Sequence, residues 1–295
     1  MRTLLVFALA LACRPAQPPG PDRDALAVEV QRWHAARLAE LRADQGWLTL
    51  AGLWWLADGE HRLGAAADAD LVFPAGAPAS IGALTRRGGD VRLRVDPDVD
   101  VRMAGAPVSD VALRPGVDRV DVGPRFTFTV IARGDRLGVR LWDSEAPERR
   151  AFAGIPMFPP SAAWQVRARF ERHATPRVID HPTVLGTTQP AEVPGVAIFA
   201  IAGHEHRLTP ILEHGPHGDE LLFVFRDLTS GVETYAGGRF LVTELPAGAD
   251  LTLDFNRAHN PPCAFTAYAT CPLPLPENRL AVRVEAGEQT PADHP

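Results

Sequence analysis

The chain has 295 residues and a formal net charge of −6, with 46% hydrophobic and 22% charged residues. This composition is typical of a globular protein with one large or two small domains. The 36 acidic residues outnumber the 30 basic ones, which argues against a nucleic-acid partner. All basic residues are arginine. The lack of lysine excludes Schiff-base and pyridoxal chemistry, Walker-type phosphate loops and kinases.

The N-terminus has the features of an export signal. Residues 1–12 combine an early arginine with a short apolar run that ends at Cys13, too short to span a bilayer. Residues 13–22 are a Pro-rich tether. We therefore predict a lipoprotein, lipidated on Cys13 and held on the periplasmic or surface side of the cell envelope, with membrane contact only through this anchor. The alternatives are a plain cleaved signal on a soluble secreted or periplasmic protein, and a cytosolic chain.

A helix is expected over residues 23–43, where Leu26, Val30, Trp33 and Leu41 share one face at helical spacing. Arg37 lies in the middle of this apolar face, which indicates snorkelling or a structural ion pair.

An unusual apolar stretch, 46–56, contains three of the six tryptophans. It has two interpretations. One is a stacking platform for a sugar or aromatic ligand. The other, which we favour, is a core plug that anchors the helix against a sheet.

Most of the remaining chain is expected to form short strands and turns. Residues 126–131 and 137–142 form a hairpin around Gly134 and Asp135, with Arg and Asp expected on a half-solvated face. After a Pro-rich connector, 146–163, further strands are expected. They are 164–171, 177–180, 196–201, 207–212, 220–226, 239–243, 250–255 and 280–285.

These elements predict a mainly β fold with antiparallel sandwich or barrel-like sheets and one N-terminal helix. We assign residues 23–145 to the helix and a small β module, and residues 146–295 to a second β module. The alternative is that the two pack as one domain.

Familiar catalytic motifs such as GxSxG, HExxH and GxGxxG are absent from the sequence. His204 and His206 share one face of a strand, a weak metal signal without a third ligand. No metal or other cofactor is predicted. Cys263 and Cys271 are expected to lie near each other, either as a disulfide or as free thiols.

The C-terminal third carries the candidate site. On the strand 250–255, Asp254 and Asn256 belong to a polar face that leads into a long Pro-rich loop. Gly237 and Gly238 before Arg239 indicate a bulge or a close backbone approach. We predict one polar cluster at this point. Its members are Arg239, Asp254, Asn256, Asn260 and Glu277, with Tyr235 and Asn278 as further ligand-binding candidates.

Several segments resemble the family known as domain of unknown function 1684. They are GWLTLAGL at 46–53, ETYAGGRFL at 233–241, DFNRAHNPPCAF at 254–265, CPLP at 271–274 and PENRL at 276–280. The departures, such as His259 in place of the family's usual tyrosine, leave the polar set intact. The resemblance implies no established activity.

Three functional classes remain open. They are a protein that binds a small-molecule or peptidic ligand, a hydrolase- or transferase-like enzyme, and a structural lipoprotein. An enzyme would use Cys263 as nucleophile or Asp254 as general base. The classes differ in whether Arg239, Asp254 and Asn260 converge on an open pocket or bind loop carbonyls.

Overall fold

A computed structural model of the chain describes residues 23–215 and 218–292. The predicted signal peptide, Cys13 and the whole tether lie outside the described residues. Among the helices that are described, none is long and apolar enough to cross a membrane.

The N-terminal module consists of two sheets around one core, with strand orders β1-β11-β10-β9-β6-β7 and β3-β2-β4-β5-β8. Its core contains Phe73, Phe126 and Phe128. The strands are β1 (Leu50–Trp55), β2 (Gly59–Gly64), β3 (Leu71–Val72), β4 (Gly82–Arg87), β5 (Asp90–Val95), β6 (Val101–Met103), β7 (Ala106–Pro107), β8 (Asp110–Leu113), β9 (Val120–Val122), β10 (Phe126–Arg133) and β11 (Arg136–Asp143).

The C-terminal module has sheets ordered β14-β13-β12-β18 and β15-β16-β17. Phe223, Phe225 and Phe255 are completely buried in its core. The strands are β12 (Gln165–Pro182), β13 (Thr188–Ile201), β14 (His204–Leu208), β15 (Ile211–Gly215), β16 (Gly218–Phe225), β17 (Arg239–Glu244) and β18 (Asp250–Asp254). The mainly β, antiparallel prediction is therefore confirmed.

The C-terminal module differs in detail from the predicted strands. The expected strand 207–212 is divided at Pro210, which lacks an amide hydrogen, into β14 and β15. The expected strands 164–171 and 177–180 form one strand, β12, with a register shift between Arg172 and Arg177. Residues 280–285 form no strand. Hydrogen bonds from side chains, as well as from the backbone, hold this segment in place.

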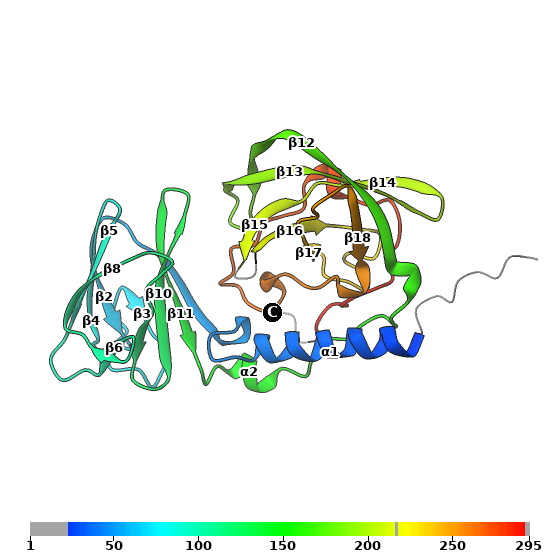
Figure 1. Cartoon of the computed structure of the whole chain (residues 1–295). Coiled ribbons are helices and arrows are strands. Elements are labelled where there is room, and N and C mark those ends of the chain that lie inside the picture. Colours follow the sequence, from blue (N-terminus) through cyan, green and yellow to red (C-terminus); the bar gives the residue numbers. More distant parts are fainter. Residues whose placement is uncertain (1–22, 216–217, 293–295) are drawn as a thin grey trace, which may run out of the picture.

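Helix α1 (Arg23–Leu41) runs beneath the C-terminal module (Figure 1), although the sequence grouped it with residues 23–145. Arg37 forms an ion pair with Glu288, with 2.6 Å between Nε and Oε1, so its predicted ion-pair role is confirmed. Leu41 and Leu48 pack with Phe265, which agrees with the plug interpretation of 46–56. Further short helices are α2 (Pro147–Ala151), η1 (Trp47–Thr49), η2 (Ala162–Trp164), η3 (Phe255–Arg257), η4 (Pro262–Ala264) and η5 (Pro276–Asn278).

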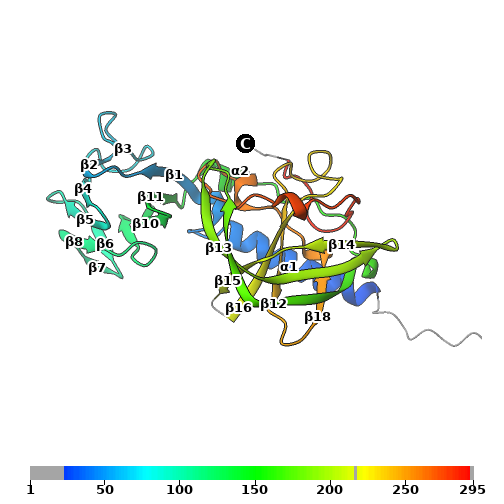
Figure 2. The ribbon, with the colours of Figure 1, turned by 90° about the horizontal axis from the view of Figure 1, so that it is seen from above.

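The hairpin β10–β11 positions the N-terminal module against the C-terminal one. From above, β1 and β11 lie on the side of their module that faces the C-terminal module (Figure 2). The predicted turn is present, with Arg133 paired to Arg136. The expectation of a half-solvated polar face is wrong for Arg140 on β11, which is buried. Trp47 of η1 packs on the Arg140 guanidinium, a contact that strand periodicity does not reveal.

Candidate functional site

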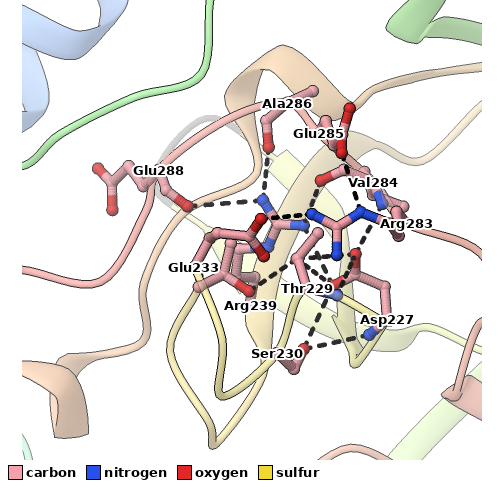
Figure 3. Close-up of polar contacts among 11 residues, drawn as sticks. Asp227, Thr229, Ser230, Glu233, Arg239, Arg283, Val284, Glu285, Ala286 and Glu288 are labelled. Carbon is pink, nitrogen blue, oxygen red and sulfur yellow. Dashed lines mark hydrogen bonds and ion pairs between the residues drawn. The ribbon is translucent and has the colours of Figure 1, made fainter.

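Arg239 opens β17 and is completely buried. Its guanidinium donates to backbone carbonyl oxygens of the C-terminal segment, including that of Val284 at 2.9 Å and that of Ala286. The carboxylate of Asp227 accepts from the Arg239 Nη2 at 3.3 Å and from the amide of Val284 at 2.7 Å. Figure 3 shows this arrangement around the extended chain. Arg239 therefore clamps the C-terminal segment.

Gly238 allows the strand to enter this clamp. It has a φ of +95°, and a Cβ atom there would lie 2.6 Å from the carbonyl oxygen of Phe225 and 2.8 Å from Cγ of Pro274. A side chain would therefore be strained and would also clash. The predicted close backbone approach is confirmed.

Asn260 belongs to a second group of polar residues, centred on the buried carboxylate of Glu288. Glu288 Oε2 accepts from the backbone amide of Asn260 at 2.8 Å and from its Nδ2 at 3.1 Å. Arg37 of α1 donates to Glu288 and, at 2.7 Å, to the carbonyl oxygen of Asn260. The buried Oδ1 of Asn260 has no hydrogen-bond partner among the described residues.

Asp254 and Asn256 form a third group. Asp254 Oδ1 accepts from Asn256 Nδ2 at 2.8 Å, and Asn256 exchanges two hydrogen bonds with the backbone of Ser161. Asp254 Oδ2 lies 3.7 Å from Nε of Arg257. These contacts attach the connector 146–163 to the end of β18.

The two neighbouring candidates of η5 have different environments. Asn278 is completely buried and bonds the amide and carbonyl of Thr209 and the carbonyl of Val224. Glu277 is exposed. The expected single cluster is therefore only partly formed. The groups of Arg239 and Asn260 meet at Glu288, whose carbonyl oxygen accepts from Arg239 Nη1 at 3.5 Å, whereas Asp254 with Asn256, and Asn278, belong to separate groups that attach loops to the sheets.

His204 and His206 lie on β14, where His204 is exposed and His206 packs on the ring of Phe199 at a centroid distance of 5.8 Å. Across the described residues there is no group of three or more His, Cys, Asp or Glu side chains suited to a metal ion.

Cys263 and Cys271 are both free thiols and lie side by side. The amide of Cys263 donates to Sγ of Cys271 at 3.2 Å. The Tyr235 hydroxyl donates to the carbonyl oxygen of Cys263 at 3.3 Å, and burial raises the pKa of Tyr235. The expected proximity of the cysteines is confirmed.

A cleft of about 540 Å³ opens between the two modules and α1. The N-terminal module contributes Arg133 from the tip of β10. The remaining lining includes Arg37, Trp47, Asn260, Thr270 and Cys271. Glu213 of β15 also lines it, and burial and Glu220 raise the pKa of this carboxyl group. Asn260 and Cys271, from the region that the sequence singled out, are therefore among the residues that line the cleft.

Arg133 lines this cleft, and Arg140 packs on Trp47, another lining residue. Arg140 is 7% exposed, its guanidinium lies 5.3 Å from the ring centroid of Trp47, and its Nε and Nη2 have no hydrogen-bond partner among the described residues. Arg133 donates from Nε to the hydroxyl of Thr270 at 3.0 Å. Burial, together with Arg133, lowers the pKa of Arg140 to about 10. Within residues 23–215 and 218–292, neither arginine forms an ion pair with a carboxylate.

Sequence reasoning missed Arg133 and Arg140 because both occupy ordinary polar positions of an alternating strand. Asp227 and Glu288 were missed for a similar reason, since each follows or precedes a turn-like segment. The only sequence signal of a buried charge is a charged residue among apolar neighbours, and this signal identified Arg37 alone.

The chain is thus a protein of two β modules with an arginine-lined cleft between them. Residues 150–289 match the family model described as "Protein of unknown function (DUF1684)", and the chain belongs to this family. No curated protein matches the chain.

Three solved structures are similar. An uncharacterized protein of Haloarcula marismortui, solved by NMR, is 32% identical over 50% of this chain and 83% of that one, with a TM-score of 0.41. The FhaA FHA domain, solved with the intracellular domain of Rv3910, is 17% identical over 30% of this chain and 96% of that one, with a TM-score of 0.22. The Rv0020c FHA structure is 19% identical over 32% and 93% of the two chains, with a TM-score of 0.23. These TM-scores are too low to support a functional inference.

Proposed function

We propose that the chain is a binding protein that holds a small ligand with a carboxylate or phosphate group in the cleft between its modules. The carrying observation is Arg133, which lines the cleft and has no carboxylate partner among the described residues. Behind the lining residue Trp47 lies the buried guanidinium of Arg140, whose Nε and Nη2 are unpartnered in the described part of the chain. Burying a charge without a counter-charge is unfavourable by several kcal/mol. A bound anion offsets this penalty, and the planar guanidinium matches the oxygens of both groups.

A second feature favours a peptidic or amide-bearing ligand. The Asn260 Oδ1 acceptor is buried without a partner in the described part of the chain, and Asn260 lines the same cleft. An N–H group of the ligand would satisfy this acceptor, as unsatisfied buried polar atoms are unfavourable by about 1–3 kcal/mol. A peptide C-terminus offers both the carboxylate and an N–H donor.

The proposal includes attachment to the cell envelope through a lipidated Cys13, as the sequence predicts. The ligand would then be an envelope metabolite or peptide. Arg239, Asp254, Asn256 and Asn278 have structural roles in this proposal, because their polar atoms bind loop backbone and neighbouring side chains.

Binding is tested by thermal shift and calorimetry with three probes: inorganic phosphate, succinate, and an N-acetylated dipeptide with either a free or an amidated C-terminus. Ligands that bind only the folded state raise its melting temperature. We expect saturable binding of at least one anion. Preference for the free dipeptide over its amide would identify the carboxylate as the recognised group, and preference for phosphate would identify a phosphorylated ligand.

The site is tested with Arg133→Gln, which removes one guanidinium at the mouth of the cleft. We expect affinity to fall roughly tenfold or more, since hydrogen bonds to charged groups contribute about 1.5–3 kcal/mol. Arg94→Gln is the matched control, because Arg94 lies on β5 in the other sheet of the same module and its side chain is 68% exposed. Equal losses in both variants, or no binding of any probe by the wild type, would contradict the proposal.

A further inference from the structure

We propose that Cys263 and Cys271 are a redox-modification site, at which a hydroperoxide converts the two thiols into a reversible intramolecular disulfide. We further propose that this disulfide strengthens anion binding in the cleft, and this second part rests on the proposed function.

The backbone holds the two sulfur atoms near each other. Cys263 lies in η4, and its amide donates to Sγ of Cys271 at 3.2 Å. The two side chains also lie within hydrogen-bonding reach of each other. Proline residues flank both cysteines, at 261, 262, 272 and 274. Because each proline fixes its φ angle, the thiols stay adjacent without a covalent link.

The two thiols differ in exposure and in charge. Cys263 is partly exposed, whereas Cys271 is buried. A hydrogen bond from Cys271, with one from Tyr235, lowers the pKa of Cys263 to about 7. The hydrogen bond with Cys263, and burial, raise the pKa of Cys271. Cys263 is therefore the attacking thiolate and Cys271 the resolving thiol.

The reaction balances in two steps. The Cys263 thiolate attacks one peroxide oxygen, the O–O bond breaks, and the departing oxygen takes a proton to become water or an alcohol. Cys263 is now a sulfenic acid. The Cys271 sulfur then attacks the Cys263 sulfur, the S–O bond breaks, and the hydroxide leaves with the Cys271 proton as water. Two electrons pass from the thiols to the peroxide.

The thiols are coupled to the cleft through charge. Cys271 lines the cleft, and the Cys263 thiolate lies within hydrogen-bonding reach of it. Disulfide formation removes the negative charge of this thiolate from the wall of the cleft. A ligand anion then meets less negative charge, so the oxidised protein should bind it more tightly.

The first arm of the test does not depend on a ligand. Hydrogen peroxide is added to the full chain, and peptide masses and alkylation of free thiols are measured before and after reduction with dithiothreitol. We expect a link between Cys263 and Cys271 that reduction reverses. Cys271→Ser should instead accumulate oxygen on Cys263, and Cys263→Ser should react more slowly. Oxygen addition without a cross-link in the wild type, or equal reaction rates in wild type and Cys263→Ser, would overturn the proposal.

The second arm measures the affinity for inorganic phosphate and for succinate in the reduced and oxidised protein. We expect roughly fivefold tighter binding after oxidation, the effect of one nearby charge at high dielectric constant. Cys263→Ser, which lacks this thiolate, should show no such change on peroxide treatment. Equal affinities in the two redox states would overturn the coupling and leave the proposed function intact. Absence of binding in both states would overturn the proposed function and the coupling. The disulfide itself is tested separately, by the peptide masses of the first arm.

Discussion

The guanidinium of Arg239 and the carboxylate of Asp227 form an ion pair in which neither side chain is exposed to solvent, with 3.3 Å between Nη2 and Oδ1. The pair also holds the C-terminal segment, because both residues form hydrogen bonds with the backbone of Val284. Arg239 thus supplies donors, and Asp227 an acceptor, for a C-terminal segment that has no strand partner along 280–285. This relationship explains why a charged residue opens β17.

Replacing Arg239 with lysine should destabilise the fold. Lysine keeps the charge but loses the planar array of donors that reaches several carbonyl oxygens. We expect the free energy of unfolding in urea to fall by roughly 1–3 kcal/mol, whether or not an anion is present. Arg283→Lys is the control, since Arg283 pairs with Glu233 and Glu285 and its side chain is 42% exposed. Full stability of Arg239→Lys, with loss of ligand binding instead, would contradict the clamp.

Glu288→Gln should weaken the attachment of α1 to the C-terminal module. The completely buried carboxylate accepts from Arg37 and twice from Asn260, and the amide of glutamine brings a donor into this set of donors. Breaking a buried ion pair is unfavourable by about 3–5 kcal/mol. The change is measured by urea unfolding, with Glu285→Gln at a side chain 54% exposed as the control. Comparable stabilities of the two variants would show that the ion pair between Arg37 and Glu288 does not stabilise the fold.

Acidification should destabilise the protein through His259. Burial, and then the charge of Arg37, lower the pKa of His259 from 6.5 to about 3. Between these values the unfolded chain binds more protons than the folded one, so the free energy of unfolding falls as the pH falls. One such group contributes at most about 1.4 kcal/mol per pH unit.

This pH dependence is measured by urea unfolding between pH 6.5 and 4.5. The variant His259→Phe should show a shallower decline than the wild type. A residual slope is expected, because burial also lowers the pKa of His34 and His181. An unchanged slope in His259→Phe would mean that His259 does not supply the linkage.

Cys13 should carry lipid when the full chain is expressed in a bacterial host. Metabolic labelling with a fatty-acid probe is expected to mark the wild type and not Cys13→Ala, because the apolar run ends at this cysteine and a Pro-rich tether follows. Labelling that persists in Cys13→Ala would place the lipid elsewhere. An unlabelled wild type would leave the alternatives of a plain export signal or a cytosolic chain.

The mainly β fold, the N-terminal helix and the close approach at Gly238 could all be predicted from the sequence. Each depends on local chemistry: alternation of apolar residues, helical spacing, or a backbone angle that favours glycine. The sequence also pointed to Arg37, because a charge in the middle of an apolar helical face needs a partner.

Which polar residues meet depends instead on the packing of segments that are far apart in the chain. Asn260 and Glu288 are 28 positions apart and Arg37 and Glu288 are 251 apart, so no local pattern predicts these contacts. Arg140 has the same alternating context as a solvated strand residue, yet it is buried because a second module approaches the outer face of its sheet. Alternation specifies which face of a strand a side chain occupies, whereas the packing of distant segments decides whether that face meets water.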